Sequence, residues 1–488
     1  MDWLSDPGAW MGRLVFTRGI ALVYLIAFVA ALRQGPALIG THGLTPVPRF
    51  LRYAPWQKAP SLFHLHWSDR FFAGCCWVGI VLSLAALVGL ADRLPIASWM
   101  ALWLVLWALY LSIVNVGQIW YGFGWETLLL EAGFLTVFVG PAHVAPPTLV
   151  MWLLRWLLFR LEFGAGLIKM RGDRCWRDLT CLAYHHETQP MPNPLSWWFH
   201  RLSPRLHKVE TLANHVTQLV VVFGLLLPQP IAGVAAAIMV ITQGYLLISG
   251  NFAWLNALTL VLGLSVLDGR WLDAVLPVER PGELSSPTWF TVTGVVLTVV
   301  VAVLSLGPVR NMLSPNQAMN TSFDPLRLVN SYGAFGSVTR VRRELIVEAT
   351  DDPHPGPDTV WREYEFKGKP GNVHRRPPQW APYHLRLDWL MWFVALSPAY
   401  GRSWLPAFLG KLLEADPATL RLLRSAPFGP DRPAAVRVLL YRYRFTTRAE
   451  RRATGAWWHR DLERQLVAPL TAEDVPGVSG GGRGRSGS

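Results

Sequence analysis

Long stretches without ionisable side chains constrain this chain more than any other feature. Neither residues 94–125 nor residues 211–267 contain Asp, Glu, Lys or Arg. A bilayer core about 30 Å thick needs about 20 apolar helical residues, so each stretch is long enough to cross a membrane. The 488-residue chain is 52% hydrophobic and 16% charged, whereas about a quarter of a soluble domain is charged. The sequence therefore predicts an integral membrane protein and excludes a disordered, collagenous or small disulfide-stapled one.

Apolar segments of this kind recur over the first part of the chain, and we expect about nine crossings. Six of the expected crossings lie near residues 14–32, 71–91, 94–125, 126–141, 147–170 and 287–306. The segment 211–267 is too long for two crossings and fits three, with breaks near 228–230 and 249–251. The first crossing is not a cleavable signal peptide, because no small-residue cleavage site follows it.

Beyond residue 308 the composition changes to that of a water-facing domain. Residues 344–349, 361–366 and 437–445 are β-branched or aromatic with partial alternation, which indicates strands, and 385–396 and 405–413 indicate amphipathic helices. The predicted fold is a polytopic α-helical membrane bundle followed by a β-rich α+β soluble domain. We expect boundaries at 1–310 and 311–475, with a flexible Gly-rich tail at 476–488. The net charge of +13 favours membrane lipids as the counter-charge, and no nucleic-acid-binding motif is present.

Charged side chains cluster on the fourth and fifth expected crossings. They are Glu126, Glu131, Arg155, Arg160, Glu162 and Lys169. An ionisable group at bilayer depth costs about 2.5 to 3.5 kcal/mol on insertion scales, so such groups usually pair inside the bundle. Two interpretations stay open: an ion-pair network that locks two helices, or a polar pocket that binds a substrate or a lipid head group. Lys169 fits either a base with a lowered pKa or a side chain that reaches the interface.

The segment after the fifth crossing carries Cys175 and Cys181 in a polar loop. A disulfide fits this pair if the loop faces an oxidising compartment, and free thiols fit if it faces the cytosol. His185, His186 and Glu187 are interpreted as hydrogen-bonding loop residues, because adjacent histidines point in divergent directions and the zincin pattern is absent. No metal is expected. The tract QPMPNP that follows predicts an extended strap across the surface.

Several long strings resemble the lipase maturation factor family. They are GWETLLLEAGFL at 124–135, FRLEFGAGLIKMRGDRCWRDLTCLAYHHETQPMPNPLSWWFH at 159–200, and further strings at 250–268, 330–352 and 364–396. The resemblance covers both expected domains. It implies a membrane protein that helps certain dimeric lipases to reach an active fold, without a catalysed reaction, catalytic residues or a cofactor. A fainter similarity, through GAGLIKMRGDRCW, links the first half to the transmembrane domain of vitamin K-dependent carboxylases.

Two functions from different classes follow. The first is a folding factor for secreted client proteins, possibly lipases, whose soluble domain offers cationic groups and exposed aromatic side chains as contacts. The candidate residues for these contacts are Arg375, Arg376, Trp380, Trp389 and Trp392. The second is a membrane enzyme that acts on a lipid or a peptide, with Lys169 as the base and the charged cluster as its pocket. A transporter finds no support, because the sequence shows no internal repeat.

Two sequence signals conflict on which side of the membrane the soluble domain lies. Nine crossings would place the first loop, the loop with Cys175 and Cys181, and the soluble domain on one face. The Lys and Arg content of those loops favours the cytoplasm, whereas the resemblance and the Cys pair favour the outside. We expect the extracytoplasmic face. The short amino terminus and the Arg- and Gly-rich tail suggest a bacterial homologue in the plasma membrane, while the family's eukaryotic members lie in the endoplasmic reticulum.

Overall fold

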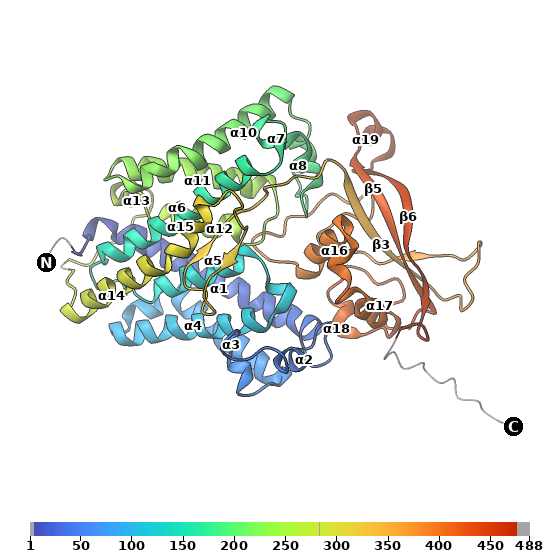
Figure 1. Ribbon diagram of the computed structural model, residues 1–488, viewed down its shortest axis with the longest axis horizontal. Helices are drawn as coiled ribbons and strands as arrows, with labels where there is room; N and C mark the ends of the chain where they lie inside the picture. The colour runs from blue at the N-terminus through green and yellow to red at the C-terminus, as the bar shows by residue number, and fades with distance from the viewer. Residues whose placement is uncertain (1–3, 283, 476–488) are drawn as a thin grey trace.

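A computed structural model describes residues 4–282 and 284–475 of the chain. A helical bundle formed by the first two thirds lies beside a region built on an antiparallel sheet, with helices between the sheet and the bundle (Figure 1). This order confirms the predicted helical region followed by a sheet-containing region. The tail predicted at 476–488 lies outside the described residues.

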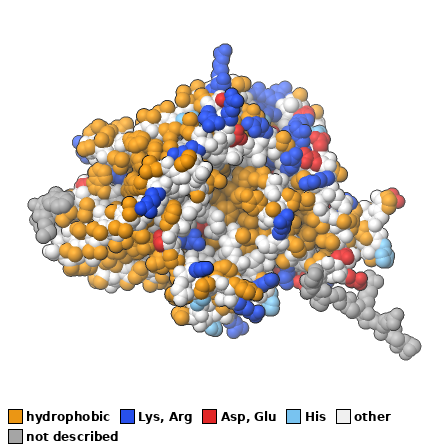
Figure 2. All heavy atoms as spheres, viewed as in Figure 1, with side chains coloured by type: hydrophobic (Ala, Val, Ile, Leu, Met, Phe, Trp, Pro, Cys, Tyr) orange, Lys and Arg blue, Asp and Glu red, His pale blue; other side chains and the backbone are white. Residues whose placement is uncertain are grey.

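Within the described residues, six helical segments are long and apolar enough to cross a bilayer. They are Pro7–Leu38 (η2 with α1, Trp10–Leu38), Asp69–Leu87 (α3), Ile96–Val116 (α4), Pro204–Leu226 (α10, Pro204–Leu219, with η6, Val221–Leu226), Ile231–Ser249 (α11), and Thr288–Leu313 (α14, Thr288–Leu304, with α15, Leu306–Leu313). On the face shown in Figure 2, hydrophobic side chains cover most of the left part, where Figure 1 places the bundle, whereas Lys and Arg gather at the top and right, toward the sheet-containing region. Val81 is 61% exposed and Ile241 is 72% exposed, as expected of helix faces in contact with lipid.

The other three predicted crossings coincide with helices of a different kind. These are α5 (Gly124–Thr136), α6 (Thr148–Arg171) and α12 (Leu255–Leu264). At about 1.5 Å per residue, α5 and α12 are too short to span the core alone. Helix α6 is long enough but carries the charged residues of the fifth predicted crossing. The structure therefore supports six candidate spans, and the count of nine stays a prediction.

Close packing explains a glycine in the middle of α6. The helix runs without interruption through Gly164. A Cβ atom at Gly164 would lie 2.4 Å from the carbonyl oxygen of Tyr332. Only glycine therefore lets the segment that enters the sheet-containing region lie directly on α6.

Short helices fill the loops of the bundle. They are α2 (Val47–Leu51), α7 (Arg174–Arg177), α8 (Leu182–Thr188), α9 (Ser196–Phe199) and α13 (Gly269–Val275). Helices α7, α8 and α9 belong to the loop between α6 and α10. The QPMPNP tract lies between α8 and α9 without regular structure, but residues 189–193 are buried, so the prediction that this strap crosses the surface is wrong.

The second region is a four-stranded antiparallel sheet in the order β4-β3-β5-β6. Its strands are β3 (Arg342–Thr350), β4 (Arg362–Glu363), β5 (Ala435–Phe445) and β6 (Trp458–Thr471). Leu345 lies opposite Leu440 and Val347 opposite Val438. Helices α16 (Arg386–Leu396), α17 (Leu405–Leu413) and α18 (Pro417–Leu420) pack between the sheet and the bundle, with α16 on β3 and α18 against α1 (Figure 1).

The sheet differs from the sequence prediction in two places. The segment 361–366 contributes only the two residues of β4, and the longest strand, β6, was not predicted at all. Strand β6 lies at the sheet edge and is mostly exposed, so its charged residues carry no apolar alternation that would mark a strand. The remaining strands are β1 (Thr321–Ser322) and β2 (Asn330–Ser331), and the last α-helix of the described residues is α19 (Arg448–Thr454).

Candidate functional site

Glu126 joins the membrane bundle to the sheet-containing region. It lies in the first turn of α5 and is fully buried. Arg386, the first residue of α16, donates from Nη1 to Glu126 Oε1 over 2.6 Å and to the carbonyl oxygen of Trp120 over 2.6 Å. The Tyr110 hydroxyl of α4 also donates to Glu126, and His384 Nδ1 lies 3.3 Å from Oε1. We name these four residues, Tyr110, Glu126, His384 and Arg386, the first junction.

Glu131, five residues further along α5, forms a second connection. Arg160 of α6 pairs with Glu131 and donates to the carbonyl oxygen of Asn330 over 2.6 Å. The second carboxylate oxygen accepts from the Asn330 backbone N–H over 3.0 Å and from the Tyr332 hydroxyl over 2.7 Å. We name Glu131, Arg160, Asn330 and Tyr332 the second junction. In both junctions a carboxylate of α5 is matched by a guanidinium, as expected of buried charges in a stable network.

Glu162 and Lys169 of α6 lie in a different environment. They line a cavity of about 460 Å³ between α6, α10, α11 and the loop that contains α7 and α8. Glu162 accepts from the side-chain amides of Gln218 over 2.9 Å and Gln243 over 2.6 Å. Lys169 donates to Asn214 over 2.6 Å and to Gln218 over 2.8 Å. Gln218 therefore bridges a carboxylate and an ammonium group that do not touch each other.

The rest of this cavity is mainly apolar. Its other lining residues include Leu182, Leu206, Val209, Ile241, Leu246, Phe252 and Phe335. Val209 and Ile241 also face outward, with exposed fractions of 60% and 72%. The cavity thus combines an apolar wall next to the lipid-facing surface with a polar end, which is the composition of a ligand site.

Arg155 is not part of either junction or of the cavity. Its guanidinium lies 4.7 Å from the ring centroid of Trp152, one turn earlier on α6. The Trp152 side chain is 38% exposed, whereas Arg155 itself is buried, with an exposed fraction of 9%. The predicted charged cluster is therefore divided into two interregional junctions, one cavity and one separate arginine.

The candidate contact residues of the sheet-containing region have internal roles. Arg375 Nη1 donates to the carbonyl oxygen of Phe366 over 2.7 Å, and Trp380 Nε1 donates to that of Lys367 over 3.1 Å. Arg376 is exposed and donates to the carbonyl oxygen of Pro194 over 3.1 Å, in the strap. The expectation that Trp389 is exposed is wrong, because only 3% of it is accessible. Trp389 instead packs in the aromatic core between α16 and α5.

Stacked Arg and Trp side chains join the same region to the loop before α10. Arg376 lies 5.0 Å from the Trp198 ring centroid, and Arg451 of α19 lies 3.4 Å from that of Trp457. Trp198 and Trp457 also contact each other edge to face. Such cation–π contacts are worth about 0.5 to 1 kcal/mol each at exposed sites, so this surface adds to the attachment of the two regions.

A third buried network holds the strap. Arg342 of β3 donates to the carbonyl oxygens of Glu187 over 2.9 Å and Pro190 over 3.0 Å. Its charge is balanced by Glu344, which also lies 2.9 Å from Lys369 Nζ. All three of these charged side chains are fully buried. The sheet thereby fixes the extended backbone of the strap.

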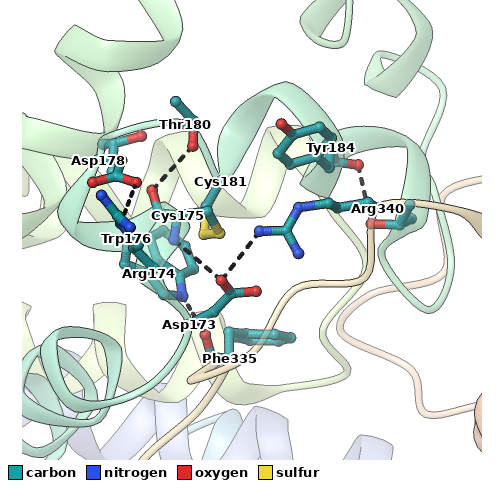
Figure 3. Close-up of a disulfide and its surroundings, with 12 residues drawn as sticks. Asp173, Arg174, Cys175, Trp176, Asp178, Thr180, Cys181, Tyr184, Phe335 and Arg340 are labelled. Carbon is teal, nitrogen blue, oxygen red and sulfur yellow. Dashed lines mark hydrogen bonds and ion pairs between the residues drawn. A yellow bond between two sulfur atoms is a disulfide. The ribbon is translucent and has the colours of Figure 1, made fainter.

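Cys175 and Cys181 form a disulfide in the same loop (Figure 3). Asp173 accepts from the Cys175 backbone N–H over 3.1 Å and from Arg340 over 3.3 Å. The N–H group and the arginine both lower the pKa of the Asp173 carboxyl, the N–H group more. Trp176 Nε1 donates to the carbonyl oxygen of Phe335 over 2.8 Å. The disulfide-closed loop is thus attached to the chain segment that leads into the sheet.

Sequence reasoning missed the uncharged and distant partners of these charges. Arg386 lies in the segment 385–396, which predicted only an amphipathic helix, and His384 directly precedes that segment, whereas Asn330 lies in a short turn-rich stretch. Gln218 and Gln243 lie in the stretch without Asp, Glu, Lys or Arg. An amide in an otherwise apolar helix was the available signal, because a buried amide needs hydrogen-bond partners.

Comparisons with known proteins agree over both regions. A family model described as the lipase maturation factor transmembrane domain matches residues 11–274, and one described as the lipase maturation factor C-terminal domain matches residues 328–468. Lipase maturation factor 1 of Bos taurus is 43% identical, over 96% of this chain and 90% of that protein. The Homo sapiens protein of the same name is 40% identical, over 96% and 89%. Lipase maturation factor 2 of Gallus gallus is 29% identical, over 96% and 82%. No solved structure matches.

Proposed function

Because this chain belongs to the lipase maturation factor family, we propose that it is a membrane-embedded maturation factor that assists the folding or assembly of lipases. The observation that carries this proposal is the similarity to proteins named for lipase maturation, which covers 96% of the chain at up to 43% identity. The alternative of a membrane enzyme acting through Lys169 gains no support from these relatives.

The attachment of the two regions suggests how such a factor works. Glu126 and Arg386 form a buried ion pair between the bundle and the sheet-containing region. The Glu131–Arg160 pair lies within the bundle and binds the segment before the sheet through Asn330 and Tyr332, and Arg342 of β3 donates to backbone carbonyl oxygens of the strap. Removing one partner of a buried pair costs about 3 to 5 kcal/mol of stability. Moving the two regions apart would break such a pair and is therefore unfavourable. The sheet-containing region therefore acts as a platform held at a fixed height over the bilayer, where a client emerges. It is not a domain on a flexible tether.

We place this platform on the extracytoplasmic side. The disulfide between Cys175 and Cys181 supports this side, because disulfides persist in oxidising compartments. Nine crossings, with α5, α6 and α12 added to the six apolar spans, would put the two ends of the chain on opposite faces. The proposed division into 1–310 and 311–475 separates the bundle from the platform, and the membrane would be a bacterial plasma membrane or, in eukaryotic relatives, that of the endoplasmic reticulum.

Activity of a secreted lipase tests the function. The lipase is expressed with and without this chain, and its activity is divided by the amount of lipase protein. We expect a higher specific activity with the chain, loss of that gain in Arg386→Met, and an unchanged gain in Arg452→Ala, which alters an exposed residue of α19. Equal specific activity and equal lipase amounts with and without the chain would refute the proposal for that lipase.

Labelling of introduced cysteines tests the orientation separately. Arg452→Cys lies on the platform, and Arg93→Cys lies in the exposed turn between α3 and α4 at the opposite end of the bundle. A maleimide that cannot cross membranes should label Arg452→Cys in intact cells and Arg93→Cys only after permeabilisation. The reverse pattern would place the platform in the cytoplasm.

A further inference from the structure

Three potential metal ligands meet where α8 lies against the start of α10. His186 comes from α8, and His207 and Glu210 lie one turn apart on α10. One ligand atom from each residue lies within 4.8 Å of the other two. His207 Nδ1 is 3.1 Å from Glu210 Oε2, and His186 Nε2 is 3.9 Å from the same oxygen. The sequence expectation of no metal considered His186 only with its neighbours His185 and Glu187.

Those neighbours point elsewhere. His185 stacks on Phe252 with ring centroids 5.9 Å apart. Glu187 accepts from the Phe445 backbone N–H over 2.7 Å. Only His186 of this trio turns toward α10, so the three ligands come from residues that are separated in sequence and are joined by the fold.

His186 is a buried imidazole without a hydrogen-bond partner. It is 2% exposed, and neither ring nitrogen bonds another group among the described residues. A buried polar group that lacks a partner is unfavourable, and native structures usually satisfy it. His207 is 3% exposed, so two imidazoles flank one carboxylate oxygen in a place largely closed to water. A cation bound between them would give His186 Nε2 a partner and neutralise the carboxylate.

Neighbouring side chains orient these ligands. The Tyr245 hydroxyl of α11 donates to Glu210 Oε1 and leaves Oε2 directed at the histidines. Phe199 stacks on the His186 ring at 5.5 Å with an interplanar angle of 23°. Hydrogen bonds that fix a ligating carboxylate are typical of metal sites, and the stacked Phe199 ring holds the His186 imidazole in place.

We propose that His186, His207 and Glu210 bind a divalent transition-metal ion, with Zn²⁺ as the preferred ion. Two imidazole nitrogens and one carboxylate oxygen form a ligand set that zinc accepts, and three protein ligands leave one coordination position open. Glu210 and Tyr245 line the cavity of about 460 Å³ that also contains Glu162 and Lys169. The open position therefore faces this cavity, where a ligand with an oxygen or nitrogen donor reaches the metal. The metal site does not depend on the proposed function.

Metal binding by the purified full chain in detergent tests the site. The protein is stripped with a chelator, dialysed and titrated with Zn²⁺, and bound zinc is measured by mass spectrometry. We expect one zinc ion per chain and an affinity at least about tenfold lower in Glu210→Gln and His186→Phe, in line with the loss of a ligand. His374→Ala, at an exposed histidine, is the matched control and should bind zinc as the wild type does.

A second measurement keeps the test valid if these variants fold poorly. Co²⁺ added to the wild-type protein should give visible absorption bands of a four-coordinate site, and added Zn²⁺ should remove them. Zinc should also raise the thermal unfolding midpoint of the wild type, because a ligand that binds only the folded state stabilises it. Absence of stoichiometric zinc and of cobalt bands in the wild type would overturn the proposal, as would equal zinc affinity in the wild type and Glu210→Gln.

Discussion

Two carboxylates of the bundle, Glu126 and Glu162, are both buried yet meet opposite kinds of partner. Glu126 is paired with the guanidinium of Arg386 from the sheet-containing region. Glu162 is held by two amides and borders a cavity. A guanidinium fills the space around its carboxylate and ties two regions together, whereas amides hold a carboxylate and leave room beside it. The comparison teaches that buried charge in this protein serves attachment at one place and is available to a ligand at the other.

Arg386→Met should have the largest effect, because it leaves Glu126 buried without its cation. We expect a loss of about 3 to 5 kcal/mol in stability, the cost of breaking a buried ion pair. Thermal unfolding in detergent measures it, and faster protease cleavage between the two regions should accompany it. Arg452→Ala is the control. A loss below about 1 kcal/mol, the usual value for a surface ion pair, would show that the first junction does not attach the regions.

Acidification should weaken the same junction through His384. Burial first, and then Arg386, lower the pKa of His384 from 6.5 to about 4. Between these two pH values the unfolded chain binds a proton that the folded chain does not, so stability falls as the pH falls from 6.5 toward 4. At 1.36 kcal/mol per pKa unit the loss reaches about 3 kcal/mol.

Unfolding midpoints of wild type and His384→Asn across this pH range measure the effect. The variant lacks the titrating imidazole, so its stability should fall less steeply with acidification. Parallel curves for the two proteins would remove His384 as the cause.

Lys169→Met should cost less than Arg386→Met. The methionine keeps the length of the side chain but leaves the oxygens of Asn214 and Gln218 without their donor, at about 1 to 3 kcal/mol for unsatisfied buried groups. Unfolding midpoints of the two variants, measured side by side, test the order. If Lys169→Met is the more damaging change, the cavity end is a structural junction and the comparison fails.

Glu162→Gln should have the smallest effect. It removes a buried charge that has no guanidinium partner, so the relief of burying that charge offsets the weaker hydrogen bonds to Gln218 and Gln243. We expect a change within about 1 kcal/mol, determined by the same unfolding assay. The matched variant Glu126→Gln, which unpairs Arg386, should be clearly more destabilising, and equal effects of the two would show that the environments of the carboxylates do not differ.

Part of this organisation could be predicted from the sequence, since it depends on local pattern. Apolar stretches predicted the helical region, and the segments 344–349 and 437–445 fall within β3 and β5. Strand β6 was not predicted, because an exposed edge strand needs no apolar face and so shows no apolar alternation in the sequence. The pairing of Glu126 with Arg386 was not predicted either, because the two residues lie far apart in the chain and no local pattern selects one cation among many.

The sequence alone determined that this chain enters a membrane, that a sheet-containing region follows the helices, and which family it resembles. These features follow from composition, periodicity and long matching strings, which are properties of contiguous residues. The tertiary structure decided which carboxylate meets a guanidinium, which borders a cavity, and that His186 joins His207 and Glu210. Those outcomes depend on the directions in which side chains from distant elements converge, and only the packed chain sets these directions.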